Sequence, residues 1–420
     1  MSTYEITVEK MVSGGDCISK INGKTVFVPY AIPGERLEVE IVKDFRDYCQ
    51  AKITKILEAS PYRTKAFCPF YMNCGGCNMQ HISENFQREL RKSILKDAFA
   101  REGIFLDDEK TDVIYGNSLS YRCRFQFHNG GLMARGTNQI IPIQNCPCAN
   151  KEINHYLKEI PFENRPEGRV QIFGSEKITS IPDGFDKIIV AKETELQKQS
   201  RNSSSQTALA KKKLKNQKKI RPMYSGSTGD SGNSCTVKIC EKEISFDVQG
   251  FFQSNLEVLE KTIPVALKEL EGKNALDMYC GCGTFSKFLG DKFEKLCLVE
   301  HNKSALVYAE KNLSQIPHES FGLSGEVWAK YHAENYVKNN GNFDALVVDP
   351  PRSGMEKEVR KWIASSKIPK ISSFSCDIAT HARDIKFLLQ SGYSLKKLYL
   401  LDFYPQTSHI ESLALLDYEN

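Results

Sequence analysis

The sequence predicts an α/β protein in three parts: a small β-barrel, a cysteine-rich central domain and a C-terminal domain built on a parallel sheet. Short alternating segments fill the first sixty residues, a group of cysteines follows, and apolar strands alternate with helical segments from about residue 256 onward. A chain of 420 residues is long for a single hydrophobic core. We therefore expect domains at 1–60, 61–240 and 241–420.

The first part contains five strand-like segments separated by turn signals. Asn22-Gly23 favours a hairpin turn, and Ile32-Pro-Gly-Glu35 interrupts the chain before the fourth segment. The segments are Tyr4–Val8, Cys17–Ile21, Lys24–Pro29, Arg36–Val42 and Cys49–Ile56. So many strands in so short a length suit an oligonucleotide-binding-type barrel, although a purely structural barrel would show the same pattern.

A cysteine loop follows the barrel, with the sequence Cys68-Pro-Phe-Tyr-Met-Asn-Cys74-Gly-Gly-Cys77. Thiolates at this spacing can point at one centre, as a soft metal ion or an iron–sulfur cluster requires, and a fourth ligand must come from elsewhere. Cys146 is the better candidate for that ligand and Cys148 is its competitor. Zinc is the alternative metal, because four thiolates suit it as well.

The rest of the central part combines one helix, several strands and a basic insertion. Ser83–Arg101 has helical periodicity with Ser83 as the expected N-cap, and strand patterns return between Tyr121 and Ile143. A polar, disordered insertion is expected near 197–233, because Lys211–Arg221 carries seven basic residues and no acidic one. This run accounts for the net charge of +5, so any nucleic-acid-binding surface elsewhere must arise from folding rather than from bulk charge.

The cysteine content and the absence of an apolar run predict a cytoplasmic location. The sequence begins without a secretory signal, and it has no stretch of roughly 18 apolar residues that could span a membrane. Fourteen cysteines are scattered along the chain. In a reducing compartment they would serve as ligands and nucleophiles rather than as disulfides.

The C-terminal part has the alternation of strands and helices that is typical of a parallel sheet. Thr236–Val248 is expected to be a strand, and helices begin near Leu256. The later strand candidates are Ala275–Met278, Leu296–Val299, Ala345–Val348 and Lys370–Ser375. Ligands bind such sheets at the carboxyl ends of the strands, where the motifs described next lie.

Two of these strand ends suggest a site for S-adenosylmethionine. Asp277 lies four residues before Gly281-Cys-Gly283, a glycine loop that lets the backbone approach a ligand closely. The loop lacks the third glycine of a dinucleotide-binding motif. Glu300 ends the next strand with a carboxylate suited to ribose hydroxyls.

Two further strand ends and one later segment carry groups suited to catalysis. Asp349-Pro-Pro351 fixes an extended loop after one strand, and Cys376 follows the next strand on the same face of the sheet. His409 and Glu411 are two residues apart, so both side chains would point the same way in an extended segment.

Together these motifs resemble the RNA uridine C5-methyltransferases that carry an iron–sulfur cluster, and the resemblance covers nearly the whole chain. The first sixty residues are similar to a TRAM domain, including Val26-Phe-Val-Pro29. Phe251-Phe-Gln-Ser-Asn255 resembles the motif whose glutamine contacts S-adenosylmethionine. The chain departs from the family at Asp377-Ile378, where Asn-Pro is common, and in the insertion near 197–233.

The resemblance implies a class I (Rossmann-like) methyltransferase domain, preceded by a TRAM/OB-like barrel and a cysteine-cluster domain. The implied ligands of a 4Fe-4S cluster are Cys68, Cys74, Cys77 and Cys146. The implied residues that bind S-adenosylmethionine are Gln253, Tyr279, Glu300 and Asp349. Cys376 corresponds to the nucleophile and Glu411 to the proton acceptor.

The reaction implied by the resemblance transfers a methyl group to C5 of a uridine in RNA through a covalent bond between Cys376 and C6. Cytosine-specific enzymes of the two-cysteine type have a cysteine where this chain has Pro351. The presence of both barrel and cluster favours 23S rRNA over tRNA as the substrate of an enzyme expected to be a monomer.

Two other classes of protein would fit parts of the sequence. A cluster-containing, non-catalytic RNA-binding protein would not require Cys376 and Glu411. An amino-group methyltransferase could use Asp349-Pro-Pro351 and would need no thiolate.

Overall fold

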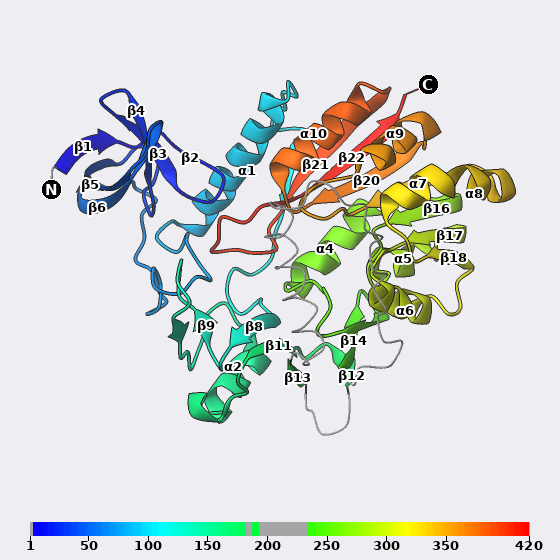
Figure 1. Cartoon of the computed structure of the whole chain (residues 1–420), viewed down its shortest axis with the longest axis horizontal. Coiled ribbons are helices and arrows are strands. Elements are labelled where there is room, and N and C mark those ends of the chain that lie inside the picture. Colours follow the sequence, from blue (N-terminus) through cyan, green and yellow to red (C-terminus); the bar gives the residue numbers. More distant parts are fainter. Residues whose placement is uncertain (1–2, 182–186, 193–232, 420) are drawn as a thin grey trace, which may run out of the picture.

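The computed structural model describes residues 3–181, 187–192 and 233–419 (Figure 1). A barrel of short strands lies at one end, an eight-stranded sheet with helices lies at the other, and small sheets lie between and below them. The insertion predicted near 197–233 lies almost entirely outside the described residues. Within the described ranges, no helix is both long enough and apolar enough to cross a membrane.

The N-terminal barrel is a six-stranded sheet in the order β1-β5-β6-β4-β3-β2. Its strands are β1 (Thr3–Thr7), β2 (Lys10–Met11), β3 (Cys17–Ile21), β4 (Lys24–Val28), β5 (Arg36–Asp44) and β6 (Tyr48–Glu58). The sequence predicted all of these except the short β2. Alternating side chains such as Val26, Val28 and Leu37 are fully buried and form the interior.

The buried carboxylate of Glu35 connects the barrel to the segment that follows it. It accepts hydrogen bonds from the backbone N–H groups of Ile32 (2.9 Å) and Ser60 (3.2 Å) and from Arg63 Nη2 (2.6 Å). A buried carboxylate needs this number of donors. The Ile32-Pro-Gly-Glu35 motif therefore both forms a turn and attaches the barrel to the segment that follows it.

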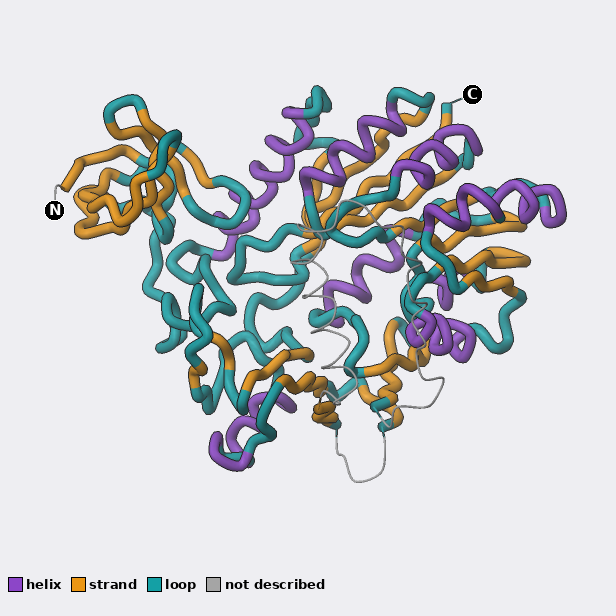
Figure 2. The backbone as a smooth tube through the Cα atoms, viewed as in Figure 1, coloured by secondary structure: helices purple, strands orange, loops and turns teal. Residues whose placement is uncertain are grey.

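The central region consists of small sheets joined by long loops (Figure 2). Its elements are β8 (Arg124–His128), β9 (Leu132–Met133), β10 (Ile140–Ile141), α2 (Lys151–Glu159), the short 3₁₀ helix η1 (Phe162–Asn164), β11 (Arg169–Gly174), β12 (Ile178–Ser180), β13 (Ile188–Lys192), β14 (Ser234–Ile239) and β15 (Lys242–Asp247). The prediction of one strand over Thr236–Val248 was wrong. Cys240 and Glu241 both have positive φ (43° and 66°) and form a tight hairpin turn without the usual Asn-Gly signal.

The C-terminal sheet has the order β18-β17-β16-β19-β20-β22-β21-β7. Its strands are β7 (Thr111–Ile114), β16 (Gly272–Met278), β17 (Phe293–Val299), β18 (His318–Phe321), β19 (Ala345–Val348), β20 (Lys370–Ser375), β21 (Tyr393–Leu401) and β22 (Glu411–Tyr418). The prediction of a parallel sheet was incomplete, because β22 runs antiparallel to both β20 and β21. The antiparallel β22 brings Glu411 to the edge where the parallel strands end.

Helices cover both faces of this sheet (Figure 1). The helices on one face are α1 (Glu84–Arg101), α7 (Gly325–Tyr331), α8 (Ala333–Asn340), α9 (Lys357–Ser366) and α10 (Ile378–Leu389). Those on the other are α4 (Leu256–Ala266), α5 (Thr284–Leu289) and α6 (Lys303–Asn312). Strand side chains alternate between the faces: Leu276 and Met278 contact the first group, and Ala275 contacts the second.

Part of the predicted central domain belongs structurally to the C-terminal sheet. Strand β7 pairs in parallel with β21, and α1 packs against α10. Ser83 occupies the N-cap position of α1, as predicted, but its side chain makes no capping hydrogen bond. A fully buried ion pair, Arg91 Nη1 to Asp402 Oδ1 at 2.7 Å, joins α1 to the segment after β21. This segment leads to Glu411.

Candidate active site

Four predicted site residues directly follow four neighbouring parallel strands. Tyr279 follows β16, Glu300 follows β17, and Asp349 follows β19. Cys376 follows β20. Glu411 begins the antiparallel β22, whose next residue pairs with the last residue of β20. The sheet therefore brings all five residues to one edge, where α/β proteins bind ligands.

The loop after β16 is shaped by residues with positive φ. Tyr279, Gly281 and Gly283 have φ of 64°, 56° and 77°, and Gly283 is the N-cap of α5. A Cβ on Gly283 would lie 3.0 Å from Leu313 Cδ1, so the close packing of this turn on α6 requires glycine.

Asp277, inside β16, has a structural partner in α5. Its carboxylate accepts hydrogen bonds from the backbone N–H (3.1 Å) and the hydroxyl of Ser286. Burial raises the pKa of Asp277 to about 7, and these hydrogen bonds oppose that shift. This carboxylate fixes the glycine loop rather than facing a ligand.

Glu300 holds the same loop from the neighbouring strand. Its buried carboxylate accepts hydrogen bonds from the backbone N–H groups of Gly281 (3.0 Å) and Asn302 (2.6 Å). Tyr279 donates a hydrogen bond from its hydroxyl to Glu356 at the start of α9. Both predicted cofactor residues therefore have fixed orientations before any ligand binds.

Gln253 lies apart from the strand ends, in the segment between β15 and α4. Its backbone carbonyl accepts a hydrogen bond from the thiol of Cys123 (3.6 Å). Among the described residues, its side-chain Oε1 is buried and has no hydrogen-bond partner. A buried acceptor without a donor is costly, so this oxygen is suited to a donor supplied by a ligand.

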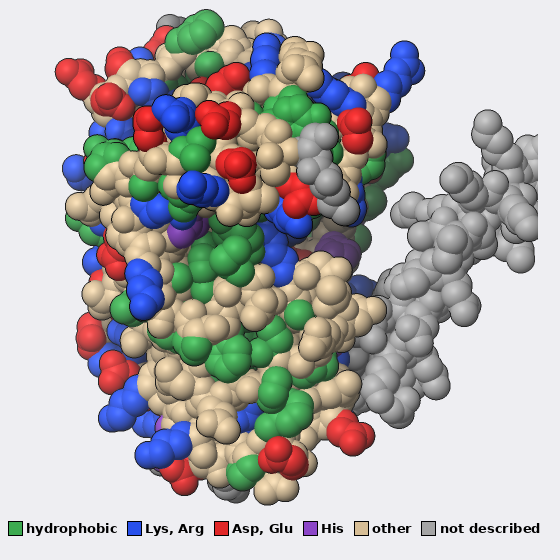
Figure 3. Space-filling model, turned by 90° about the vertical axis from the view of Figure 1, so that its left-hand side faces the viewer, with side chains coloured by type: hydrophobic (Ala, Val, Ile, Leu, Met, Phe, Trp, Pro, Cys, Tyr) green, Lys and Arg blue, Asp and Glu red, His purple; other side chains and the backbone are tan. Residues whose placement is uncertain are grey.

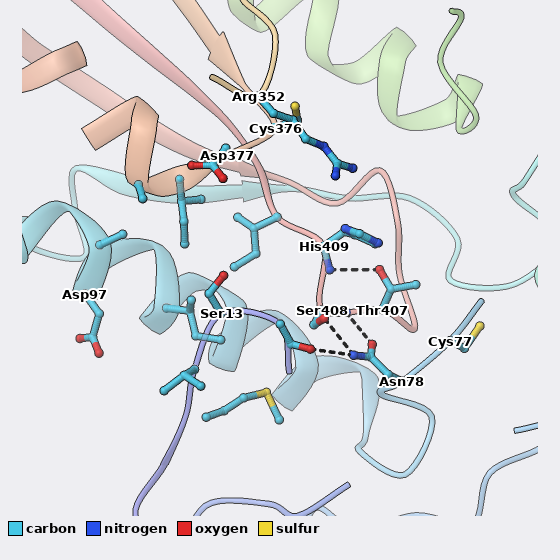
Figure 4. Close-up of a pocket in the computed structure, with 18 of the residues that line it drawn as sticks. Ser13, Cys77, Asn78, Asp97, Arg352, Cys376, Asp377, Thr407, Ser408 and His409 are labelled. Carbon is cyan, nitrogen blue, oxygen red and sulfur yellow. Dashed lines mark hydrogen bonds between the residues drawn. The ribbon is translucent and has the colours of Figure 1, made fainter. Parts of the chain in front are cut away.

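The thiol of Cys376 lies among charged groups that the sequence only partly indicated. Burial, followed by the charges of Glu411 and Asp349, raises the pKa of Cys376, whereas Arg352 opposes the shift and donates a hydrogen bond to the thiol. Figure 4 shows Arg352 beside Cys376, with His409 below them. Sequence reasoning missed Arg352, although it directly follows the Asp349-Pro-Pro351 motif.

The two carboxyl groups near Cys376 both hold protons more strongly than usual. Burial raises the pKa of Asp349 to about 7. Burial and the charge of Asp349 raise the pKa of Glu411 to about 8, and Arg352 opposes this shift. Groups that exchange protons near neutral pH are suited to general acid–base catalysis.

His409 does not share a strand with Glu411, contrary to the expectation of one extended segment. It lies in the loop before β22, is exposed, and lines the pocket. Arg352 influences both His409 and Glu411 electrostatically, so the two side chains approach the same site from different elements.

Cys376 opens into a pocket of about 440 Å³ between the three parts of the chain. The barrel contributes Met11–Gly14, the cysteine loop contributes Gly75–Asn78, and the C-terminal part contributes Cys376–Ala379 and Thr407–Ile410. Figure 4 shows these segments converging below Cys376. A pocket of this volume can enclose a single nucleotide base.

The outer surface near the barrel carries no broad region of one charge in the view of Figure 3. Lysines and arginines alternate there with aspartates and glutamates, as the balanced composition predicts. Three arginines, Arg101, Arg135 and Arg352, line the pocket itself, where a guanidinium group can contact a phosphate.

The predicted cluster cysteines line a second pocket, of about 370 Å³. It contains Cys68, Cys74, Cys77, Cys146 and also Cys148. The sulfur atoms of Cys77 and Cys148 are 3.7 Å apart, and the Gly76 N–H donates to Cys74 Sγ at 3.4 Å. In the described part of the chain, no three His, Cys, Asp or Glu side chains are gathered as a metal site.

The thiols of this pocket interact with one another. The hydrogen bond from Cys148 lowers the pKa of Cys146 to about 6 and also lowers the pKa of Cys77, while the pKa of Cys148 is raised. The donor chemistry, several thiols on one small pocket, fits a soft metal centre. Both candidates for the fourth ligand line the pocket, so the structure does not choose between Cys146 and Cys148.

Comparison with known families and proteins gives a consistent result. Residues 132–419 match the family "tRNA (Uracil-5-)-methyltransferase", and residues 1–54 match the TRAM domain. The chain is 37% identical to an RNA methyltransferase of Treponema denticola, over 98% of both chains. It is 28% identical to a 23S rRNA (uracil(1939)-C(5))-methyltransferase of Shewanella amazonensis, over 99% of this chain and 96% of that one.

A solved structure has the same fold over nearly the whole chain. It is the tRNA (uracil-54, C5)-methyltransferase of Pyrococcus abyssi in complex with S-adenosyl-L-homocysteine, with a TM-score of 0.70 and 22% identity. The match covers 98% of this chain and 99% of that chain. The three-part architecture is thus found in a known protein from end to end.

Proposed function

The chain belongs to the tRNA (uracil-5-)-methyltransferase family, and we propose that it methylates C5 of a specific uridine in 23S rRNA. It is an S-adenosylmethionine-dependent RNA (uracil-C5-)-methyltransferase with a TRAM domain and a Rossmann-like catalytic domain. One observation carries the proposed chemistry. Cys376 follows β20, Asp349 follows the neighbouring β19, and Glu411 begins β22 beside the end of β20, so a thiol and two carboxyl groups share one edge of the sheet.

The first step of the proposed mechanism activates the uracil ring. The Cys376 thiolate adds to C6, a C–S bond forms, and the electrons of the C5=C6 bond move to O4 as an enolate. Arg352, which donates a hydrogen bond to Cys376, stabilises the thiolate that must form first. The thiol proton passes to Asp349, which leaves the Glu411 carboxylate free for the later step.

The second step transfers the methyl group, and the third restores the ring. S-adenosylmethionine, when bound, supplies an electrophilic methyl group to C5 and leaves as S-adenosylhomocysteine. Glu411 then removes the C5 proton, the C5=C6 bond re-forms, and Cys376 leaves C6 as a thiolate. The raised pKa of Glu411 makes its carboxylate a stronger base than an ordinary glutamate.

The proposed cofactor residues suit this donor. Gln253 would accept a hydrogen bond through its unpaired Oε1, and Glu300 would hold the ribose hydroxyls beside the glycine loop. Tyr279 and Asp349 would bound the same cleft from the ends of β16 and β19. The target uridine must leave its base stack to reach Cys376, which favours a loop or flipped nucleotide.

We also propose that the cysteine pocket holds a 4Fe-4S cluster through Cys68, Cys74, Cys77 and Cys146, with zinc as the alternative metal. The donor set of several thiols supports this proposal. Because methyl transfer consumes no electrons, the centre would shape the RNA-binding region. None of the fourteen cysteines forms a disulfide, which supports a reducing, cytoplasmic location. We expect the enzyme to be a monomer.

The choice of 23S rRNA over tRNA rests on the relatives. A curated relative that acts on 23S rRNA matches at 28% identity, whereas the architecture alone does not discriminate, because a tRNA enzyme shares it throughout. The deciding experiment maps 5-methyluridine in ribosomal and transfer RNA from cells with and without the protein. Loss of the modification from tRNA alone would overturn the rRNA assignment.

The chemistry is tested by covalent trapping. RNA containing 5-fluorouridine has no C5 proton for Glu411 to remove, so the methylated adduct with Cys376 should persist and migrate as a protein–RNA complex in a denaturing gel. We expect the complex only with S-adenosylmethionine present. A complex that forms equally well with Cys376→Ala would show that the nucleophile is wrongly assigned.

A further inference from the structure

We propose that Asn78 is a positioning residue for the methyl transfer, which couples the cysteine loop and the barrel to the segment that carries Glu411. This inference rests on the proposed function. Asn78 directly follows Cys77, and the segment Thr407–Ile410 directly precedes Glu411. The two are brought together although Asn78 and Ser408 are 330 residues apart in the chain.

The side chain of Asn78 uses both ends of its amide at this junction. Its Oδ1 accepts a hydrogen bond from the backbone N–H of Ser408 (2.8 Å), and its Nδ2 donates to Ser408 Oγ (2.9 Å). Nδ2 also donates to the carbonyl oxygen of Gly14 in the barrel (3.0 Å). Figure 4 shows Asn78 between the barrel loop and Ser408, with these bonds dashed.

The backbone on both sides of Asn78 holds the same segment. The N–H groups of Asn78 and Met79 both donate to the carbonyl oxygen of Gln406, at 3.2 and 3.1 Å. The side chain of Gln406 in turn accepts a hydrogen bond from Gln87 Nε2 of α1 (3.0 Å). The backbone N–H of Gln406 donates to Gln87 Oε1 (3.2 Å). The segment before Glu411 is thus fixed by the cysteine loop and by α1.

The barrel meets this junction closely enough to require glycine. A Cβ on Gly15 would lie 2.7 Å from Asn78 Nδ2 and 2.7 Å from Ser408 Cβ, and Gly15 has a φ of +88°. No side chain fits there without displacing one of the two partners. The barrel, the cysteine loop and the catalytic segment therefore pack at one point on the wall of the Cys376 pocket.

The chemistry of this junction explains why an amide is suited to it. Only a group with both a donor and an acceptor can satisfy the Ser408 N–H and the Gly14 carbonyl together. Aspartate could accept from the Ser408 N–H, but it would place a negative charge against the Gly14 oxygen. Alanine would satisfy neither group.

Loss of the Asn78 side chain should affect the position of Glu411 more than the stability of the fold. The bond to Gly14 is exposed and those to Ser408 are partly buried, so each is worth about 0.5–1.5 kcal/mol. By contrast, a shift of about 1 Å in a reacting group can slow a reaction by on the order of 100-fold. The segment that Asn78 holds leads directly into Glu411.

The test compares Asn78→Ala, Asn78→Asp and Ser408→Ala in the full chain. We expect Asn78→Ala to lower kcat by about 10- to 100-fold while the affinity for S-adenosylmethionine and the metal content stay as in the wild type. Asn78→Asp should be intermediate, because it keeps the acceptor for the Ser408 N–H. The double variant Asn78→Ala/Ser408→Ala should be no slower than Asn78→Ala alone.

A matched control is Asn339→Ala, at an exposed position of α8, which should retain wild-type kinetics. A wild-type kcat for Asn78→Ala would overturn the proposal. So would a decrease in kcat that accompanies an equal loss of metal or of folded protein, since that indicates a structural role only.

A measurement without substrate separates this inference from the proposed function. Hydrogen exchange of the backbone amides in residues 406–410 should be faster in Asn78→Ala than in the wild type, because the Ser408 N–H loses its acceptor. If wild-type protein forms no adduct with 5-fluorouridine RNA, the proposed function fails, while faster exchange would still support the coupling. Unchanged exchange would refute the coupling whatever the enzyme methylates.

Discussion

The cysteine loop and the end of β20 both present thiols to pockets, yet their surroundings are opposite. In the first, Cys77, Cys146 and Cys148 have other thiols as neighbours and exchange hydrogen bonds with them. In the second, Cys376 has carboxyl groups and an arginine as neighbours. Thiols among thiols suit a metal centre, and a thiol beside proton acceptors suits covalent catalysis. The neighbours, rather than exposure alone, distinguish the two roles.

The largest effect that this comparison predicts is that of Cys376→Ala. Without the nucleophile, C5 of uracil is too weak a carbon nucleophile to accept a methyl group. Methyl transfer should therefore fall by at least ~10⁴-fold. Transfer of labelled methyl groups from S-adenosylmethionine to RNA measures the loss, and calorimetry should show that the affinity for S-adenosylmethionine is retained. Residual activity above one per cent would assign the covalent step to another residue.

The second effect is that of Glu411→Gln, which should stop the reaction after methyl transfer rather than before it. Glutamine cannot remove the C5 proton, so the methylated adduct on Cys376 should accumulate with ordinary RNA. Turnover should fall by about 10²–10⁴-fold, the usual contribution of a general base. Mass spectrometry of the denatured protein would detect the adduct. If no adduct forms and RNA binding is normal, Glu411 acts before the methyl transfer.

The positions of the proposed site residues at the sheet edge were predictable from sequence, because each lies directly after a strand. Tyr279, Glu300, Asp349 and Cys376 follow four apolar strand patterns, and the carboxyl ends of parallel strands meet at one edge. The strands themselves were predictable because their apolar runs are continuous and bounded by polar residues. Local patterns thus located the sheet edge and placed Cys376 there.

Other features depend on long-range pairing that local patterns do not encode. Strand β7 joins the C-terminal sheet although some 280 residues separate it from β21. The hydrogen bonds of Asn78 to Ser408 have the same origin. The turn at Cys240-Glu241 was missed because its residues adopt positive φ without glycine or asparagine, so it carried no turn signal.

A smaller effect is predicted for the cysteine loop. Cys74→Ser should remove the metal centre and weaken RNA binding about tenfold, or about 1.4 kcal/mol, while the affinity for S-adenosylmethionine stays unchanged. Visible absorbance, metal analysis and RNA-binding titrations report these quantities. If the wild-type protein contains zinc but neither iron nor sulfide, the cysteine pocket holds a zinc site and not an iron–sulfur cluster.

The same measurements identify the fourth ligand. Cys146→Ser and Cys148→Ser are matched variants on one pocket, and only the ligand should abolish metal binding when it is changed. We expect this of Cys146. The Cys148→Ser protein should keep the metal, since Cys148 would then serve only as a hydrogen-bonding neighbour.

The smallest predicted effect concerns stability at alkaline pH. Burial raises the pKa of Glu411 from its usual 4.5 to about 8, so between these pH values the folded protein holds a proton that the unfolded chain releases. The contribution of this group to stability is therefore complete below pH 4.5 and is lost as the pH rises to 8. Glu411→Gln, which stays neutral, should avoid the loss. The difference between the unfolding midpoints of Glu411→Gln and wild type should therefore be larger at pH 9 than at pH 5, by on the order of a few °C.

Arg352→Met gives the opposite test. Because Arg352 favours the charged form of Glu411, its removal should deepen the loss of stability at high pH. The cysteine pocket offers a contrast, because Cys148→Ser changes neither carboxyl group and should leave the difference between pH 5 and pH 9 as it is in the wild type. Equal pH dependence of wild type and Glu411→Gln would mean that the pKa of Glu411 is the same in the folded and the unfolded protein, so its carboxylate would be no more basic than that of an ordinary glutamate.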